Sequence, residues 1–263
     1  MFGKKYDVES LPERVYELCK VIAAGSNSND DIKWKIQPIE GETQYFNNLR
    51  DTAINLNLVE RNDSEGTLSF VQSKEVLKDI ESFRLYCNSV VWKIDCAFCE
   101  IAKVFLNSDE RWLAYPNITS NQIINEVGQA TGYTDNRYML GERFWLSFLG
   151  FGYVFEALGN IQVLPNMSIA LRDFIELSGV QKGEKYELGE FFKKVRLLCP
   201  VAIPETNNQT LSLALSCALR QLHDGREIRL TRESDAKAIW RLVPFATHEI
   251  EKEISHIEIR GGK

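Results

Sequence analysis

Apolar residues recur at helical spacing in the first part of the chain. One such face runs from Leu11 to Ile22, and Pro12 stands near its start, where the missing N–H of proline costs nothing. A polar, glycine-containing turn at 25–29 ends this helix, and a short, weakly patterned piece follows at 30–36. A second clear helical face begins at Thr43, and its apolar residues are Tyr45, Phe46, Leu49, Ala53 and Leu56. The pattern predicts helix, short helix, helix.

Two short alternating runs come next, at 58–61 and 67–71, on either side of the polar loop 62–66. Such a pair around a turn-rich loop is typical of a β-hairpin. Helix, short helix, helix and hairpin is the order of a winged helix, which is a helix-turn-helix domain with a β-wing, although many small α+β pieces share it. We expect residues 1–72 to form a first winged-helix-like unit.

The next segment, 73–110, carries apolar residues on more than one helical face. The pattern predicts either one long helix or a broken pair of helices between Ser73 and Asn107. A helix that is apolar on several faces is buried between its neighbours. We therefore interpret this segment as a helical spine that connects two units.

The same order of elements recurs over residues 111–180. Thr119 or Ser120 can cap a helix there, because a hydroxyl oxygen accepts a hydrogen bond from a free N–H of the first turn. After a second helix, the runs 153–157 and 161–165 predict a second hairpin. We expect a second winged-helix-like unit.

An aromatic stretch marks the second helix of this unit. Helical spacing places Phe144, Phe148 and Phe151 close to one face, with Trp145 at its border. Each ring buries a large area, so we expect the cluster to anchor the core of the second unit. Exposed rings would instead mark a surface that binds a partner.

A third set of elements is predicted over residues 181–263. Helices at 188–198 and 211–224 precede two alternating runs, 226–230 and 238–243, which we expect to pair as a third hairpin. The loop between these two runs is the most charged of the three hairpin loops.

The chain beyond Pro244 contains one more alternating stretch, Ile257–Ile259, which we expect to add an edge strand. No repeat is visible at the level of residue identity. The predicted fold class is therefore mainly α with small β-hairpins (α+β), built from tandem winged-helix-like units.

Composition limits what the protein can do. The 263 residues carry a net charge of −6, which weighs against nucleic acid as the main partner, because phosphate contacts need clustered Lys and Arg. No stretch approaches the ~20 apolar residues of a membrane span, and the first residues do not resemble a signal peptide. We expect a cytoplasmic protein without a membrane partner. The cysteines are expected to be reduced, unpaired and free of metal; they are Cys19, Cys87, Cys96, Cys99, Cys199 and Cys217.

The sequence contains no recognised catalytic motif. It lacks a phosphate-binding GxxxxGK[ST] loop, a GxSxG elbow and an HExxH pair. Cys96 and Cys99 form the sole CxxC, and no second pair of ligands accompanies them to hold zinc. The three histidines, His223, His248 and His256, are too dispersed for most metal sites. We expect no enzymatic activity, no cofactor and no bound metal.

Without a catalytic motif, the function that the sequence favours is the recognition of nucleic acid or of another protein. The third helix of a winged helix usually enters the major groove, where Asn, Gln and Arg read base edges. The candidate residues are Gln44, Asn47, Asn48 and Arg50 in the first unit, Asn136, Arg137 and Arg143 in the second, and Gln209, Arg220 and Gln221 in the third. The simpler alternative is that these polar residues only solvate a helix face. The helix of the first unit has a net charge of −1 between Glu42 and Leu56, which suits a protein-docking module better than a phosphate contact.

Positive charge gathers instead on the predicted third hairpin. Between residues 226 and 241 five basic residues face three acidic ones; the basic residues are Arg226, Arg229, Arg232, Lys237 and Arg241. Strand alternation turns Arg229 and Arg241 to solvent while their neighbours point inward. As a wing, this hairpin would contact DNA. In the alternative interpretation the basic side chains pair with the nearby acids.

Several stretches of the chain resemble the DpdG family. They are the opening Leu11-Pro12-x-Arg14-Val15 helix, the hairpin that follows 56–60, the aromatic segment from Arg143 to Phe151, and the closing helix and hairpin at 215–242. Members of that family are encoded with 7-deazaguanine DNA-modification and restriction systems of bacteria. The resemblance implies an accessory, non-catalytic role beside ATPases, helicases or nucleases that act on foreign DNA.

Two classes of function follow. In the first, the protein is a winged-helix adaptor of a DNA-processing or phage-defence complex and binds double-stranded DNA as well as other subunits. In the second, it is a protein–protein scaffold without direct DNA contact.

Overall fold

The computed structural model of the chain describes residues 2, 10–37, 43–107, 115, 117–203 and 209–260. The chain divides into two compact units: unit 1 comprises Met1–Ile101 and Ile124–Phe148, and unit 2 comprises Ala102–Ile123 and Leu149–Lys263. Small antiparallel β-hairpins accompany a mainly helical chain, which confirms the α+β class. The four segments expected from the sequence, with boundaries after 72, 110 and 180, stay a prediction.

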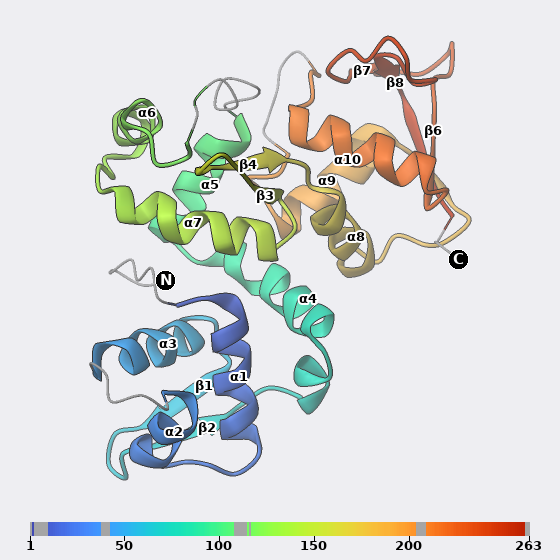
Figure 1. Ribbon diagram of the computed structural model, residues 1–263. Coiled ribbons are helices and arrows are strands. Elements are labelled where there is room, and N and C mark those ends of the chain that lie inside the picture. Colours follow the sequence, from blue (N-terminus) through green and yellow to red (C-terminus); the bar gives the residue numbers. More distant parts are fainter. Residues whose placement is uncertain are drawn as a thin grey trace. The chain divides into compact units, whose positions relative to one another are not determined.

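Unit 1 opens with three helices and a hairpin, as the sequence predicts (Figure 1). These elements are α1 (Pro12–Ala23), α2 (Asn29–Ile36), α3 (Thr43–Asn55), β1 (Val59–Asn62) and β2 (Thr67–Phe70). The Ser28 hydroxyl caps α2 by accepting a hydrogen bond from the N–H of Asp31 at 3.2 Å. The loop before α2 is tied to the hairpin, because the N–H of Leu68 donates to the carbonyl of Asn27 at 2.8 Å. The element order is confirmed, and the winged-helix assignment stays a prediction.

The segment after the hairpin is a broken pair of helices, one of the two alternatives that its apolar pattern allowed. It comprises η1 (Lys74–Leu77), α4 (Ile80–Val90), η2 (Val91–Lys93) and α5 (Ala97–Asn107). The Asp79 carboxylate begins α4 by accepting a hydrogen bond from the N–H of Ser82 at 2.7 Å. None of the six cysteines, all of which lie in the described ranges, forms a disulfide.

The helices α6 (Asn121–Thr131) and α7 (Asn136–Phe148) follow. Trp145 of α7 is fully buried in unit 1, whereas Phe144 and Phe148 are half-buried. Phe151 belongs to unit 2, where its ring packs against that of Phe174 with the centroids 6.0 Å apart. The prediction that the three phenylalanines share the buried face is therefore wrong: α7 ends at Phe148, and the tryptophan at the predicted border is the ring that it buries.

The turn at Gly150 has no room for a side chain. Its φ is +84°, and an added Cβ atom would lie 2.6 Å from the backbone nitrogen of Ala170. Gly150→Ala should therefore lower the stability of the fold in two ways: by left-handed backbone strain of roughly 1–2 kcal/mol and by overpacking of about 1–3 kcal/mol. Gly159→Ala is the matched control, because its φ is +77° and nothing lies within 4 Å of the added atom. Urea unfolding of the two variants should differ by the overpacking cost, and equal stabilities would contradict this account.

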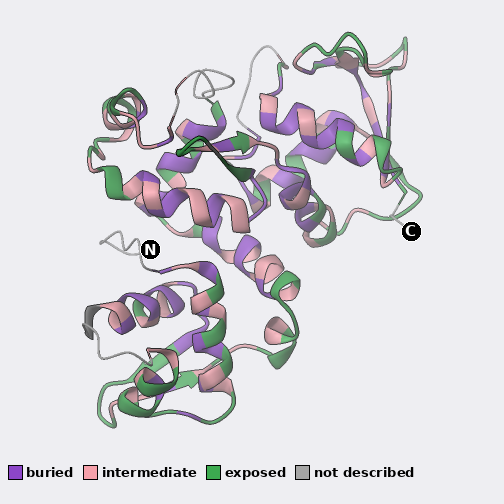
Figure 2. Cartoon of the chain, in the orientation of Figure 1, coloured by how far each residue is buried: buried purple, intermediate pink, exposed green. Residues whose placement is uncertain are grey.

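The second predicted hairpin is confirmed in unit 2. It pairs β3 (Gly152–Ala157) with β4 (Asn160–Pro165), and its turn consists of Leu158 and Gly159, both with positive φ. Three helices follow the hairpin, namely α8 (Ser168–Leu177), α9 (Leu188–Leu198) and α10 (Leu213–Asp224). Buried residues run along α10 (Figure 2).

The third predicted hairpin is wrong. The strand β6 (Ile228–Thr231) pairs with β9 (His256–Ile259), which also pairs with β5 (Lys185–Glu187), so that β9 lies in the middle of a three-stranded antiparallel sheet. The strand β7 (Trp240–Arg241) pairs with β8 (Glu253–Ile254). The expected edge strand at Ile257–Ile259 is thus a central strand. Its two isoleucines are buried, which gives β6 a better partner than the two-residue β7.

No helix in the described ranges combines the length and the apolar character needed to cross a bilayer.

Candidate nucleic-acid interface

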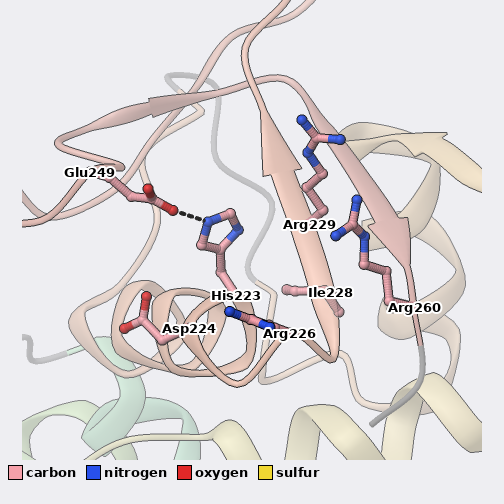
Figure 3. A pocket seen from close by; sticks show the side chains of 7 residues that line it. All are labelled: His223, Asp224, Arg226, Ile228, Arg229, Glu249 and Arg260. Carbon is pink, nitrogen blue, oxygen red and sulfur yellow. Dashed lines mark hydrogen bonds and ion pairs between the residues drawn. The ribbon is translucent and has the colours of Figure 1, made fainter. Parts of the chain in front are cut away.

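Unit 2 contains a pocket of about 700 Å³ at the C-terminal end of α10 (Figure 3). Helix α10 ends at Asp224, Gly225 caps it, and Arg226 adopts a φ of +59° in the turn that leads into β6. The pocket is lined by His223, Asp224, Arg226, Ile228, Arg229, Glu249 and Arg260. Three of these residues are arginines, so the pocket is a candidate site for an anion.

The three arginines come from neighbouring positions in the fold. Arg229 extends from β6, and Arg260 follows the adjacent strand β9 (Figure 3). Arg229 is exposed, while Ile228 and Leu230 on either side of it are buried. The predicted alternation of this strand is therefore confirmed. The backbone N–H of Arg260 donates to the carbonyl of Glu227 at 2.8 Å, which joins the end of β9 to the start of β6.

Two carboxylates that neighbour the arginines along the sheet, those of Glu227 and Glu258, are each held by an arginine. Glu227 accepts two hydrogen bonds from the guanidinium of Arg172, at 2.6 and 2.7 Å. Glu258 lies opposite Arg229 in the sheet but accepts from Arg260 at 3.2 Å. Within the described ranges neither Arg226 nor Arg229 makes an ion pair. Two guanidinium groups therefore remain available to an anion in the pocket.

On the side of the pocket opposite Arg229 and Arg260, the carboxylate of Glu249 contacts the ring of His223 (Figure 3). Nδ1 of His223 accepts the backbone N–H of Leu230 at 3.0 Å, so the ring proton of neutral His223 belongs on Nε2, which faces Glu249. His248 repeats this arrangement, with the N–H of Ile250 on Nδ1 at 2.9 Å and Asp224 facing Nε2 at 3.0 Å. The two acids thus line the pocket with their carboxylates at hydrogen-bonding distance from imidazole rings, and among the described residues neither forms an ion pair with an arginine.

The remaining basic residues of the predicted wing are placed differently. Arg232 pairs with Glu253 at 3.1 Å, and Lys237 lies 3.8 Å from Glu187. These two side chains pair with acids, as in the alternative interpretation, but the acids come from other parts of the chain and are not the neighbouring ones that it named. Arg241 is exposed on β7 and is not among the residues that line the pocket.

The candidate residues of unit 1 do not gather into one polar face. On α3, Asn48 is buried, Asn47 is half-buried, and Arg50 pairs with the neighbouring Asp51 at 2.8 Å. The side chain of Gln44 lies outside the described residues. Arg137, the second residue of α7, forms an ion pair with Asp135 at 2.7 Å.

Arg260 is a pocket residue that sequence reasoning missed. It follows a strand whose sheet partner could not be known from local pattern, and no motif marks it. The alternation of Ile257 and Ile259 showed that a strand ends there, but gave no reason to place that strand beside β6.

A protein-family model described as DpdG-like matches residues 101–236, just over half of the chain. The match includes Arg226 and Arg229 and ends before Arg260. Neither a curated protein nor a solved structure matches the chain.

Proposed function

Because the chain belongs to the DpdG-like family, we propose that it is a non-catalytic adaptor of a bacterial DNA-modification and restriction system. Membership of the family indicates a role in DNA modification. In the finer proposal, unit 2 contacts double-stranded DNA while other surfaces bind further subunits, such as an ATPase, a helicase or a nuclease.

The observation that carries the DNA contact is the pair of uncompensated arginines in the pocket of unit 2. A guanidinium group binds phosphate oxygens with two parallel hydrogen bonds, and Arg226 and Arg229 offer two such groups at one cavity, beside Arg260, which is paired with Glu258. Contacts to phosphate position a protein on DNA without reading its sequence. We therefore propose a sequence-independent contact with the backbone.

The pocket suits binding better than proton transfer. Both ring nitrogens of His223 are engaged, one by the N–H of Leu230 and the other by Glu249, so this ring is not a free general base. This arrangement supports the non-catalytic part of the proposal.

Replacing Arg226 and Arg229 together with alanine should weaken the binding of a duplex of random sequence. Each lost phosphate contact should lower the slope of log affinity against log salt by about one, so the double variant should lose about two. Fluorescence anisotropy between roughly 50 and 200 mM salt measures this slope.

The matched control is Arg232→Ala with Lys237→Ala. It removes the same amount of charge from the same unit, but from side chains that are already paired with Glu253 and Glu187. We expect a much smaller change in the slope. Equal slopes for the two double variants would sink the pocket as the DNA contact.

The scaffold without DNA contact is the second candidate function. Its support is the net charge of −6 and the side chain of Trp34 on α2, which is 73% exposed. The same titration separates the two candidates. If the unaltered protein shows no measurable affinity for DNA even at low salt, the DNA-binding adaptor is rejected and the scaffold is the better proposal.

A further inference from the structure

The β3–β4 hairpin of unit 2 exposes apolar side chains that have no role in the DNA contact. Leu158, at the tip, is fully exposed (101%), and Phe155 is 49% exposed. Tyr153, Val154 and Leu164 are also among the exposed large apolar residues, and much of the hairpin is coloured as exposed in Figure 2. Leu158 also holds a φ of +54°, where asparagine or glycine is usual. A leucine that is both strained and exposed contributes little to the folded unit itself.

The outer edge of β3 is open. A two-residue turn makes Ala157 and Asn160 a hydrogen-bonded pair, and pairs then alternate along the ladder, so Phe155 bonds to Gln162. The N–H and C=O groups of Val154 and Glu156 therefore point away from β4. In the part of the chain that the structure describes, these groups have no hydrogen-bond partner.

The edge of β4 is partly occupied, and its one backbone contact in the described ranges agrees with this phase of the ladder. Ile161 lies opposite Glu156, so its carbonyl also points outward, and there it accepts the N–H of Ile118 at 2.8 Å. Among the described residues, β3 is therefore the edge of the hairpin on which none of the outward backbone groups is paired.

The composition of the hairpin decides which class of partner fits. Between Gly152 and Pro165, Glu156 is the sole charged residue, and there is no lysine or arginine to meet phosphate. Natural edge strands are usually protected by lysine, by proline or by a bulge, and β3 has none of these. An apolar, nearly uncharged strand is the partner that such an edge accepts.

We propose that the β3 edge pairs antiparallel with β3 of a second copy of the chain, to form a four-stranded sheet about a twofold axis. With the axis at Phe155, Val154 of one copy exchanges its backbone hydrogen bonds with Glu156 of the second copy, and the reverse. The two Phe155 rings then face each other. Each Glu156 carboxylate lies opposite a valine, so like charges do not meet across the interface.

This self-complementary placement of the only charge is the reason for choosing a second copy over a different protein. Pairing through one short strand buries less than the roughly 1,200 Å² of a standard interface, so the dimer should be weak, with a dissociation constant of about micromolar or above. The inference is independent of the proposed DNA contact.

Val154→Pro tests the backbone pairing directly. It removes an N–H that points outward and leaves the hydrogen bonds between β3 and β4 in place, as proline on an edge strand does. The matched control is Val154→Thr, which keeps both the β-branched shape and the N–H. Sedimentation velocity of the full chain should show a mass that rises with concentration for the parent and for Val154→Thr, but a monomer for Val154→Pro.

A charge swap at Phe155 tests the register and does not depend on the proline variant folding. Phe155→Lys and Phe155→Glu should each be monomeric, because like charges face each other across the axis. Mixing the two variants should restore the dimer. A parent that stays monomeric up to roughly 200 µM, or a mixture that does not associate, would overturn the proposal.

Discussion

Trp145→Ala should lower the free energy of unfolding by about 3–5 kcal/mol, as expected when a large buried ring is removed. The side chain is only 1% exposed in unit 1. Its ring meets those of Phe2 and Phe148, with centroids 4.7 and 5.6 Å away. Urea or thermal denaturation measures the loss.

A hydrogen bond adds to the cost. The indole N–H of Trp145 donates to the carbonyl of Ser10 at 2.7 Å, and this bond is buried. Trp145→Phe keeps most of the ring and removes the donor, so it should lose a smaller part of the stability, about 1–3 kcal/mol for the unpaired carbonyl.

Trp34→Ala is the matched control, because it deletes the same side chain from α2, where it is largely exposed. We expect a change within about 0.5 kcal/mol. A Trp145→Ala variant that unfolds at the same urea concentration as Trp34→Ala would show that Trp145 does not anchor unit 1.

Elements that depend on short stretches of sequence were predictable. The hairpins at β1–β2 and β3–β4 are joined by local turns, so each strand finds its partner within a few residues. The strand β6 instead pairs with β9, whose residues lie more than twenty positions further along the chain. A periodic pattern identifies a strand but does not select its partner, and this is why the third hairpin was wrong.

The candidate site shows the same limit. Arg226 and Arg229 stood out by charge, but they are available to an anion only because the acid between them pairs with another residue. That acid, Glu227, is taken by Arg172 of α8, which lies 55 residues earlier. Conversely, Asn48 reads as a surface residue in the sequence and is buried in the fold. Which charges remain free is decided by tertiary pairing, and no local pattern records it.

The cysteines illustrate how packing assigns properties to residues that look alike in the sequence. Burial raises the pKa of Cys19, Cys87 and Cys199 well above the ordinary thiol value. The pKa of Cys96 is lowered instead, mainly through its side-chain hydrogen bond with Cys99, in which the Sγ of Cys96 donates to the Sγ of Cys99 at 3.6 Å. The CxxC spacing alone did not predict this difference.

Arg220→Met should cost about 3–5 kcal/mol of stability: each hydrogen bond from a charged group is worth about 1.5–3 kcal/mol, and the contributions of bonds made by one side chain are not additive. The arginine was a candidate for reading DNA bases on the third helix, yet its side chain is buried. Its guanidinium donates to the carbonyls of Val243, Ile250 and Glu251 at 2.8, 3.0 and 2.6 Å. It thereby fastens α10 to the chain between β7 and β8.

Burial disfavours the charged form of the guanidinium and so lowers the pKa of Arg220. The carbonyl groups offset this effect only while the planar guanidinium reaches all of them. Arg220→Lys keeps the charge, but a single ammonium group does not reproduce the planar set of donors of a guanidinium. We therefore expect Arg220→Lys to be less stable than the parent and more stable than Arg220→Met. Arg229→Ala, which removes an exposed arginine from the same unit, should change stability by less than about 0.5 kcal/mol.

The two roles considered for Arg220 predict different measurements. A structural role predicts that Arg220→Met lowers the midpoint of urea unfolding and leaves DNA affinity unchanged at temperatures where the variant is folded. A base-reading role predicts unchanged stability and a loss of affinity that depends on the DNA sequence. The second result would mean that α10 presents this side chain to a ligand, and that its three carbonyl contacts are not what hold unit 2 together.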